Sequence, residues 1–455
     1  MKKLRLLPLL ALSAACLSAC GGNNNKDESS AKSESGQPQE SGSSQESNAS
    51  SASSSEEVAD GEAVKVGLIC LHDTSSTYDK NFIDALDQAA KELGKKIIYE
   101  KNCLLTNINE DEACYEAAKD LVDKDCKVIF ADSFGHQAFM LRAAQEYEDV
   151  HFCHATGTNA KTAGLKNYHN AFASIYQGRF LAGYAAGLKL VDTKKAELDA
   201  GNALKVGYVG AYTYAEVMSG YTSWFLGVRN ALRDYNYDDQ KVTMDVRFTG
   251  SWYDPNGEAS AADALIKDGC VLISQHADSM GAPSTCEQAG IPNVTYNVET
   301  KSDCPNTYLA YSRINWAPYY KAVVNAVFAG KDIDSEVAHN WTGTIDTGSV
   351  EYNVNWDNLS KDAAKLEEYK AKFAAVEKNV KEKASAYVFD CSKFTVKGQH
   401  LTTYMADTDG DADFKPDTEA IKTEGDVTFF NESAVASAPY FNVEIDGINL
   451  QNRKY

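Results

Sequence analysis

The sequence predicts an α/β fold in which parallel strands are covered by helices on both faces and the chain forms two similar lobes. From Val64 onward, short apolar runs typical of buried strands alternate with amphipathic helical stretches. This alternation favours parallel sheets. The strands are too numerous for one modest sheet. Residues 205–210 (KVGYVG) also echo residues 65–69 (KVGLI), which indicates that the series of strands restarts in a second lobe.

The individual elements follow from periodicity. Residues 65–71 form the first strand-like run, and a helix follows with its apolar residues on one face: Phe82, Leu86, Ala89, Ala90 and Leu93. Gly94 is placed to end that helix. Further strands are predicted at 127–131, 150–154, 170–175, 205–211, 242–249, 270–276, 294–298 and 308–314. Amphipathic helices are predicted between them, for example at 137–147, 217–235 and 258–267.

The chain after about residue 360 has a different pattern. Residues 361–383 are predicted to form a long charged helix with a few apolar positions. Short strand-like pieces follow amid polar turns, at 387–389, 394–396 and 440–443. We expect residues 361–455 to form a C-terminal helix and extension packed on one lobe.

The N-terminus has the features of a lipoprotein signal. A basic start is followed by an apolar core at residues 6–17, which is too short for a permanent transmembrane helix. The core ends in the lipobox Leu17-Ser18-Ala19-Cys20. Residues 1–19 are therefore expected to be a signal peptide, and Cys20 is expected to carry acyl chains, palmitate among them, that anchor the protein on the extracytoplasmic face of the cell membrane. Residues 20–61 are predicted to be this anchor and a flexible polar linker.

The charge of the chain limits its partners. The formal net charge is -21, from 65 acidic and 44 basic residues. Such a surface repels phosphate backbones, so nucleic acid is not expected as a partner. After the signal peptide, no apolar run is long enough to cross a membrane.

Nine cysteines remain beyond residue 20, and this odd number cannot pair completely within one chain. Cys70, Cys153 and Cys270 lie in apolar runs and are interpreted as small buried hydrophobic residues. One disulfide among Cys103, Cys114 and Cys126 remains open. The sequence has no C-x-x-C pair, the usual signature of a structural zinc site.

The search for catalytic and metal-binding motifs argues against an enzyme. The chain contains no G-x-x-x-x-G-K-[ST] loop, no G-x-S-x-G elbow and no H-E-x-x-H motif. His151 and His154 are three residues apart on a predicted strand, so they point to opposite faces and are interpreted as packed or surface residues. Residues 407–413 resemble a calcium loop but lack its turn glycine and closing glutamate, so a solvated acidic loop is favoured. We expect no cofactor and no metal.

Candidate ligand-binding residues follow the predicted strands at their carboxyl ends, where ligands bind in open α/β sheets. Aromatic faces can stack on a flat heterocycle, and carboxylates and amides can accept its N–H groups or sugar hydroxyls. The candidates by this criterion are Tyr78, Asp79, Phe134, Tyr212, Glu216, Trp252, Asp278, Asn297 and Glu299.

Several motifs resemble the basic membrane protein family, the solute-binding lipoproteins of ABC importers for purine nucleosides or bases. The motifs are Ser133-Phe134-Gly135, residues 152–157, residues 176–183 (YQGRFLAG), residues 250–255 (GSWYDP) and residues 275–279 (QHADS). The resemblance covers roughly residues 64–355. The motif at 252–255 is similar to the branch associated with purine bases such as adenine.

The resemblance implies a type I periplasmic-binding-protein fold, with two Rossmann-like lobes joined by three crossings and a ligand clamped between them. The first lobe would comprise residues 64–174 with 299–340, and the second residues 175–298 with 341–360. Phe134 and Trp252 match ring-facing aromatic positions, and Asp79 matches an acidic residue after the first strand. Glu299 replaces an aspartate that faces the ribose in nucleoside binders. The lysine that those proteins carry shortly afterwards would fall at Ile314, beside Arg313.

The function expected from these features is that of a monomeric, non-enzymatic solute-binding lipoprotein of an ABC importer. It would bind a purine nucleoside or purine base and dock on a membrane permease that has a separate ATPase. Two other functions remain open. One is a ligand sensor that signals to a membrane receptor, and the other is an enzyme that processes purine nucleosides.

Overall fold

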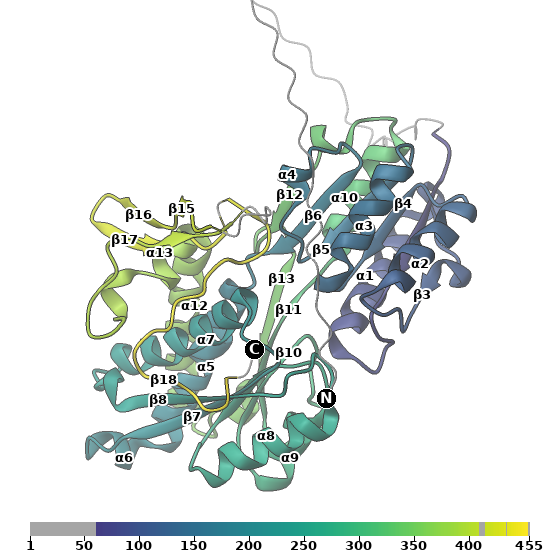
Figure 1. Ribbon diagram of the computed structural model, residues 1–455. Coiled ribbons are helices and arrows are strands. Elements are labelled where there is room, and N and C mark those ends of the chain that lie inside the picture. Colours follow the sequence, from purple (N-terminus) through teal and green to yellow (C-terminus); the bar gives the residue numbers. More distant parts are fainter. Residues whose placement is uncertain (1–60, 409–414, 434, 454–455) are drawn as a thin grey trace, which may run out of the picture. The chain divides into compact units, whose positions relative to one another are not determined.

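The computed structural model describes residues 61–408, 415–433 and 435–453. Cys20, the signal peptide and the linker lie outside the described residues. Residues 59–455 form one compact unit, and it contains two parallel sheets with helices on both faces (Figure 1). The predicted α/β class, with two lobes of similar architecture, is confirmed.

The first lobe is built on an all-parallel sheet in the order β12-β6-β5-β4-β1-β2, with β3 also paired to β1. Its strands are β1 (Val64–Ile69), β2 (Ile97–Ile98), β3 (Leu104–Leu105), β4 (Val128–Ala131), β5 (His151–Ala155), β6 (Tyr168–Ala173) and β12 (Asn340–Gly343). Its helices are α1 (Thr77–Leu93), α2 (Glu112–Asp123), α3 (Gln137–Glu146), α4 (Ala160–Ala163) and α10 (Ala317–Phe328).

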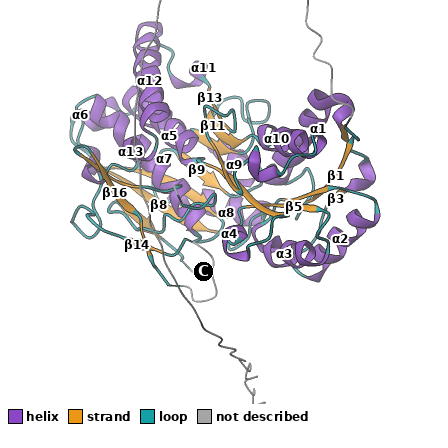
Figure 2. Cartoon of the chain, turned by 90° about the horizontal axis from the view of Figure 1, so that it is seen from above, coloured by secondary structure: helices purple, strands orange, loops and turns teal. Residues whose placement is uncertain are grey.

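Alternation along β4 shows how this sheet builds two cores. Val128 and Phe130 pack with α1 and α10, whereas Ile129 and Ala131 pack with α2 and α3 on the opposite face. Figure 2 shows these two pairs of helices on either side of the strands. Since successive strand residues point to opposite faces, a strand buried on both sides is apolar throughout, as the sequence indicated.

The second lobe has the sheet order β13-β11-β10-β9-β7-β8-β18, parallel except between β11 and β13. Its strands are β7 (Leu204–Gly210), β8 (Val242–Phe248), β9 (Ile273–His276), β10 (Asn293–Tyr296), β11 (Tyr308–Ile314), β13 (Val350–Val354) and β18 (Ile448–Leu450). Its helices are α5 (Tyr176–Thr193), α6 (Lys195–Asp199), α7 (Ala215–Asp234), α8 (Pro255–Lys267), α9 (Gly281–Ala289) and α11 (Trp356–Leu359).

Short 3-10 helices occur in both lobes and in the extension. They are η1 (Gly94–Lys96), η2 (Lys101–Cys103), η3 (Phe134–His136), η4 (Asp239–Lys241), η5 (Ile333–Ser335) and η6 (Cys391–Lys393).

Helices α5 and α7 pack closely in the core of the second lobe. A Cβ at Gly183 would collide with the backbone oxygen of Trp224, and one at Gly227 would collide with that of Phe180. These glycines therefore let the two helix backbones approach each other. Helices α8 and α9 cover the other face of the sheet.

The strand pairing places the second and third boundaries between the lobes later than the sequence suggested, and the first where it was predicted. β11 pairs with β10 in the second sheet, and β12 pairs with β6 in the first. The chain therefore crosses after β6, after β11 and after β12, so residues 299–314 belong with the second sheet and 341–343 with the first. The crossings bond to one another: Ser174 N donates to Gly343 O (2.7 Å), and Asn315 N donates to Ser349 O (2.8 Å).

The C-terminal extension packs on the second lobe. The predicted long helix is α12 (Ala363–Lys383). It is followed by α13 (Ser385–Val388) and the strands β14 (Met405–Ala406), β15 (Thr418–Glu419), β16 (Ile421–Glu424) and β17 (Val427–Phe430). β18 then adds an edge strand to the second sheet. The strand predictions at 387–389, 394–396 and 440–443 are wrong. These apolar residues instead fill the core beneath the extension, where Phe389 stacks on Phe441 (ring centroids 4.8 Å apart).

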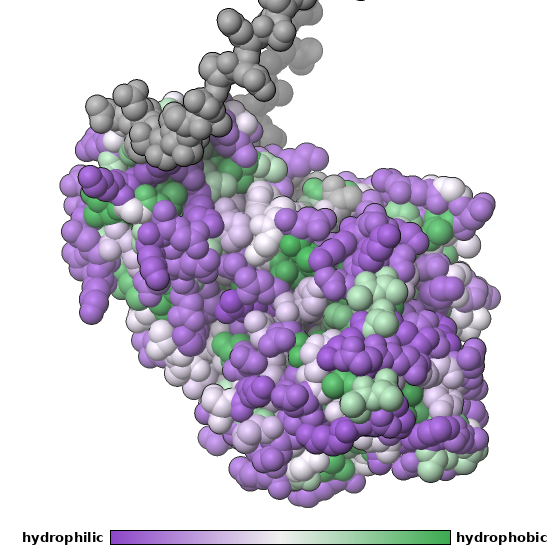
Figure 3. All heavy atoms as spheres, turned by 180° about the vertical axis from the view of Figure 1, so that it is seen from behind, coloured by the Kyte–Doolittle hydropathy of each residue, from purple (hydrophilic) through white to green (hydrophobic). Residues whose placement is uncertain are grey.

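All nine cysteines of the described residues are buried and free. The interpretation of Cys70, Cys153 and Cys270 as buried hydrophobic residues is confirmed. The Sγ atoms of Cys103 and Cys126 lie 3.8 Å apart, well beyond the roughly 2.05 Å of a disulfide bond. The face of the molecule in Figure 3 is mostly hydrophilic, with small scattered hydrophobic patches.

Candidate functional site

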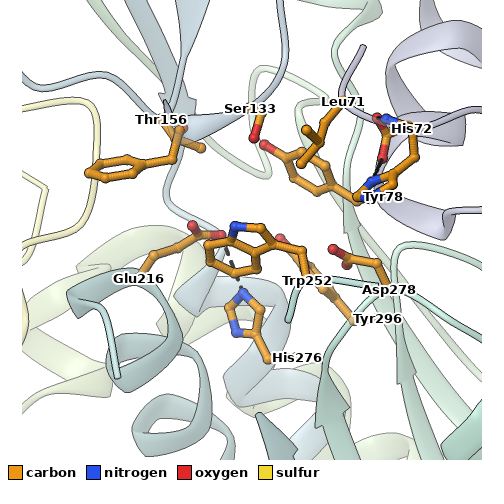
Figure 4. A pocket seen from close by; sticks show the side chains of 12 residues that line it. Leu71, His72, Tyr78, Ser133, Thr156, Glu216, Trp252, His276, Asp278 and Tyr296 are labelled. Carbon is orange, nitrogen blue, oxygen red and sulfur yellow. Dashed lines mark hydrogen bonds and ion pairs between the residues drawn. The ribbon is translucent and has the colours of Figure 1, made fainter. Parts of the chain in front are cut away.

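A cavity lies between the lobes, at the carboxyl ends of the parallel strands. It encloses about 400 Å³ of empty volume, including space open to solvent. Figure 4 shows Leu71, Ser133 and Thr156 on one side and Glu216, Trp252 and Asp278 on the other. The lining residues are Leu71, His72, Tyr78, Asp79, Ser133, Phe134 and Thr156 from the first lobe, and Glu216, Trp252, His276, Asp278 and Tyr296 from the second.

Asp79 provides a fixed carboxylate on the wall of the first lobe. It lies in the first turn of α1, which Ser76 caps. Its Oδ1 accepts a hydrogen bond from the backbone N–H of His72 (2.7 Å), and its Oδ2 accepts one from Ser76 Oγ (2.5 Å). Burial alone would raise the pKa of Asp79, but the hydrogen bonds from His72 and Ser76 lower it below its usual range. Asp79 is therefore an ionised acceptor at a helix N-terminus.

Asp132 lies behind Asp79 and has the opposite electrostatic character. It follows β4 and is fully buried, and its Oδ1 accepts a hydrogen bond from Leu71 N (3.1 Å). Burial, and then the charge of Asp79, raise the pKa of Asp132 well above its usual range. Two close carboxyl groups cannot easily both ionise, so the pair separates into one charged and one protonated member. Tyr78 donates its hydroxyl to the Asp132 carbonyl oxygen (2.9 Å), which holds the tyrosine ring at the wall.

The second lobe contributes further acidic groups. Glu216 lies in the first turn of α7, with its Oε1 3.2 Å from Nε2 of His276 at the end of β9. Burial, and then the charge of Arg179, lower the pKa of His276 to about 4. The imidazole is therefore neutral at physiological pH. It can donate a hydrogen bond to Glu216 and hold that side chain toward the cavity.

Asp278 is the most deeply buried carboxyl group of this wall. Its Oδ1 accepts a hydrogen bond from Nδ2 of Asn297 (3.0 Å). Burial, followed by the nearby charges of Glu258 and Asp79, raises the pKa of Asp278 well above its usual range. Asp278 therefore holds a proton over a wider pH range than Asp79, and a protonated carboxyl group can donate as well as accept.

Aromatic rings gather mainly on the second lobe. Trp252 meets Tyr212 edge to face at 5.0 Å, and Tyr212 stacks on Tyr214 at 5.2 Å. Across the cavity, Phe134 is 42% exposed and its ring lies 5.6 Å from that of Tyr214. An exposed apolar ring at the mouth of a polar cavity is well placed to stack on a ligand.

A buried cation balances part of this acidity. The guanidinium of Arg179 lies 3.5 Å from the ring centroid of Tyr296, and its Nη1 donates to Gln275 O (2.8 Å). Arg179 is 1% exposed and lies behind the lining residues. Carboxyl groups and rings therefore face the ligand space, while the positive charge of Arg179 is held beneath them.

The two walls already touch beside the cavity. Thr77 N donates to Asp278 O (2.8 Å), and Asn81 Nδ2 donates to Asn297 Oδ1 (3.1 Å). The rings of His72 and Tyr253 lie 5.5 Å apart across the same boundary. These contacts between lobes define a closed arrangement, in which residues 200 positions apart in sequence meet around a small cavity.

The structure brings together most of the residues predicted from the sequence. Those that line the cavity are Tyr78, Asp79, Phe134, Glu216, Trp252 and Asp278. Tyr212 packs behind Trp252, and Asn297 lies beneath Asp278, so both support lining residues. Glu299 lies elsewhere: it is exposed and accepts a hydrogen bond from Asn353 (3.3 Å). Arg313 pairs with Glu351 (2.6 Å), also outside this cavity.

Sequence reasoning did not select the remaining lining residues as ligand contacts. These are Leu71, His72, Ser133, Thr156, His276 and Tyr296. Ser133 and His276 lie in the motifs at 133–135 and 275–279, at or just after the ends of predicted strands. That position could have identified them as lining residues. Leu71 and Thr156 had no comparable signal, because neither residue type is distinctive of ligand contacts.

The C-terminal extension forms part of a second cavity that adjoins the first. This cavity encloses about 940 Å³, including open solvent, and shares Phe134, Thr156, Glu216 and Trp252 with the first. Its outer wall includes Tyr440 and other residues of the extension: Asp407, Thr408, Ala436, Ala438, Pro439 and Asn442. The acidic loop considered for calcium lies largely outside the described residues, at 409–414.

The architecture and the site define a class of protein: a two-lobed binding protein that encloses a small molecule between its lobes. A solute-binding protein of an ABC transporter from Aeropyrum pernix has a similar fold, with a TM-score of 0.53 and 13% identity over 77% of this chain and 95% of that chain. One from Conexibacter woesei gives a TM-score of 0.51 and 18% identity over 70% of this chain and 97% of that chain. These likenesses confirm the type I periplasmic-binding-protein fold.

Sequence comparison gives the family. Residues 66–388 match the Bmp family, described as PnrA-like ABC transporter substrate-binding proteins. A purine-binding protein of Brucella abortus is 31% identical over 330 residues, which cover 70% of this chain and 83% of that protein. The chain therefore belongs to the Bmp family of ABC transporter substrate-binding proteins, as the sequence motifs indicated. Within the described residues, no helix is long and apolar enough to cross a membrane.

Proposed function

We propose that this protein binds a purine base or purine nucleoside in the cavity between its lobes and delivers it to the permease of an ABC importer. The observation that carries the proposal is the combination of Trp252 and Phe134 with the carboxyl groups of Asp79, Glu216 and Asp278 around one small cavity. Flat rings suit a heterocycle, and carboxyl groups suit its ring and exocyclic N–H donors. The Brucella relative, a purine-binding protein, supports the same ligand class.

Electrostatics favours a base or nucleoside over a nucleotide. Three carboxyl groups line the cavity, whereas the one cation named there, Arg179, lies behind them. A phosphate would place negative charge among acceptors, which costs free energy in a site that is shielded from water. Glu299, at the position that faces the ribose in nucleoside binders of the family, and Arg313, next to the position of their lysine, lie outside the cavity. The sugar of a nucleoside would therefore have to extend into the second cavity, whereas a base would not need that space.

Ligand binding would work by stabilising the closed arrangement. A ligand that contacts both walls binds the closed form better than an open one, so it shifts the equilibrium toward closure. The three crossings provide the hinge, since each is a short segment between elements of different lobes. The closed form would then dock on the permease, with the chain tethered to the outer face of the membrane through lipid on Cys20.

The test is a thermal-shift and calorimetric screen of the purified full chain. The ligands are adenine, guanine, hypoxanthine, their nucleosides, AMP, uridine, glucose and an amino-acid mixture. Binding to the folded state raises Tm. We expect a rise with purine bases or nucleosides and none with AMP. A rise with glucose or amino acids alone would reject the purine assignment, and chemical change of the ligand, followed by chromatography, would indicate an enzyme.

Membrane attachment is tested separately. We expect Cys20→Ala to release the protein from the membrane fraction of cells that express the full chain, because stable anchoring needs the acyl chains. Retention of the Cys20→Ala variant in that fraction would reject the lipid anchor and leave the ligand proposal unaffected.

A further inference from the structure

Three of the chain's eight histidines gather at the amino ends of the first sheet, opposite the strand ends that form the cavity. His151 begins β5, His169 is the second residue of β6, and His339 directly precedes β12. These three strands are neighbours in the sheet (Figure 1). The ring centroids of His151 and His169 are 5.8 Å apart, and those of His169 and His339 are 5.0 Å apart. Asp334, in η5, lies beside them.

The distances around Asp334 are those of a coordination shell. Its Oδ1 is 3.3 Å from Nδ1 of His169 and 3.0 Å from Nδ1 of His339. One ligand atom from each of the three residues lies within 4.8 Å of the others. Donors held in a tetrahedral zinc site are roughly 3.3–3.5 Å apart, given bonds of about 2.0–2.2 Å. The separation from His169 lies in this range, the one from His339 is slightly shorter, and the two histidine nitrogens lie within 4.8 Å of each other.

His339 is held in the orientation of a metal ligand. Its Nε2 lies 3.2 Å from the carbonyl oxygen of Ala160. A carbonyl can only accept, so Nε2 carries a hydrogen, and Nδ1 is the ring atom that faces Asp334, 3.0 Å from each of its carboxylate oxygens. Metal-binding histidines commonly donate their second N–H to a backbone carbonyl in this way. Either a proton on Nδ1 or a bound metal ion can occupy the space between this nitrogen and the carboxylate.

His169 is buried and has unused bonding capacity. It is 1% exposed, and among the described residues neither of its ring nitrogens has a hydrogen-bond partner. The contact of its Nδ1 with Asp334 is close but lacks hydrogen-bond geometry. His151 also has a buried ring nitrogen, Nδ1, that has no hydrogen-bond partner among the described residues.

We propose that His169, Asp334 and His339 form a binding site for one divalent transition-metal ion of the zinc type, with His151 adjacent. Two imidazoles and one carboxylate suit Zn²⁺, Co²⁺ or Ni²⁺ better than Ca²⁺ or Mg²⁺, which prefer all-oxygen sites. The site is reachable from solvent, because the side chains of Asp334 and His339 are 37% and 26% exposed. A metal there would join η5 and the start of β12 to β6, directly before the third crossing between the lobes.

The test uses the purified full chain, made without a polyhistidine tag and stripped of metal with EDTA. Calorimetric titration with ZnCl₂ should show one ion bound per chain, and Zn²⁺ should raise Tm. Co²⁺ should give the visible absorption of a low-coordinate, nitrogen-containing site. Excess Ca²⁺ should not displace the ion, whereas it would displace Zn²⁺ from acidic surface groups. Absence of a saturable 1:1 titration would overturn the proposal and would indicate that Asp334 and His339 form an ion pair only.

Two conservative variants and one control complete the test. His339→Gln and Asp334→Asn should each raise the Kd for Zn²⁺ by at least about tenfold. Both residues are partly exposed, so we expect each variant to fold, and circular dichroism in the absence of metal checks this. His400→Gln changes an exposed histidine of the extension and should leave zinc binding unchanged. Equal zinc affinity in all three variants would exclude this cluster as the site.

Discussion

The two walls of the interlobe cavity differ in how they are built, although both come from lobes of the same architecture. The first wall presents the ionised Asp79, fixed by hydrogen bonds from His72 and Ser76, and one exposed ring, Phe134. The second presents Trp252 and its neighbouring tyrosines, with Asp278 holding its proton more strongly. The first wall therefore supplies the fixed charge of Asp79, and the second supplies most of the stacking surface together with Glu216. A ligand gains full affinity only when both walls touch it, which favours closure.

Asp79→Asn should have the largest effect of four substitutions that test this comparison. It replaces an ionised acceptor with an amide. The NH₂ group of that amide must face the backbone N–H of His72 or the hydroxyl of Ser76, and both of these are hydrogen-bond donors. We expect a loss of about 2–3 kcal/mol in the free energy of unfolding at pH 7, since hydrogen bonds to charged groups are worth about that much, and at least tenfold weaker purine binding. Chemical denaturation and calorimetry measure the two effects. Asp84→Asn, on the exposed face of α1, is the matched control.

The pH dependence of Asp79 has a defined sign. Its folded pKa is lowered, so it contributes stability that is present above the unfolded pKa of about 3.9 and is lost as pH falls through the folded pKa. The difference in stability between the wild type and Asp79→Asn should therefore shrink in that acidic range. A difference that stays constant down to the acid transition would show that Asp79 is not ionised.

Trp252→Ala should come next. It removes the largest ring of the second wall, and we expect purine affinity to fall by about 1.5–2 kcal/mol, or roughly 10–30-fold. Trp356→Ala removes a tryptophan that packs on Phe373, away from the cavity, and should leave affinity unchanged. Trp252→Ala should also leave Zn²⁺ binding unchanged, because the histidine cluster lies at the other end of the first sheet. Calorimetry with each ligand separates the two sites.

Phe134→Ala should have a smaller effect. The ring is the one large exposed hydrophobic side chain that the first wall contributes, so it can stack on a ligand but is not held by a surrounding core. We expect about 1 kcal/mol, or roughly fivefold, in affinity, and little change in Tm without ligand. An effect as large as that of Trp252→Ala would contradict the division of roles between the walls.

Asp278→Asn should have the smallest effect at neutral pH. A neutral amide replaces a carboxyl group whose pKa is raised by burial, and Asn297 can still donate to its oxygen. We expect purine affinity at neutral pH to change by less than about 1 kcal/mol. The variant should be at least as stable as the wild type, because folding no longer requires a carboxyl group to keep its proton. The pH dependence has the opposite sign to that of Asp79: as pH rises from the unfolded pKa toward the folded pKa, the wild type loses stability relative to Asp278→Asn. A wild type that gains stability over that range would show that Asp278 is ionised in the folded protein.

Much of the fold was predictable because each buried strand carries its own signal. The run at 64–69 is apolar except at the partly buried Lys65, since both faces of the strand are covered, and Gly94 ends α1 as the sequence suggested. The extension was less predictable. Residues 387–389 and 440–443 are apolar because they fill a core, and this composition alone does not distinguish a strand from a packed loop.

The candidate site was predictable where a distinctive residue follows a strand, as at Asp79, Phe134, Trp252 and Asp278. It was not predictable at Leu71 or Thr156, whose role depends on which loops meet across the cavity. Glu299, in contrast, was predicted as a ligand-binding residue but does not line the cavity. It follows β10 closely in sequence, yet its side chain is exposed beside Asn353, because the chain has already turned away from the cavity.

The sequence by itself determined the α/β class, the two lobes, the aromatic and acidic character of the site and the resemblance to the family that the comparisons confirmed. These follow from local periodicity and from residues that lie close together in the chain. Only the tertiary structure decided where the crossings fall, which carboxyl group of the cavity is ionised and that His169 and His339 meet at Asp334. Strand order, burial and the approach of side chains separated by more than 100 residues set these properties, and none of them is encoded in a local pattern.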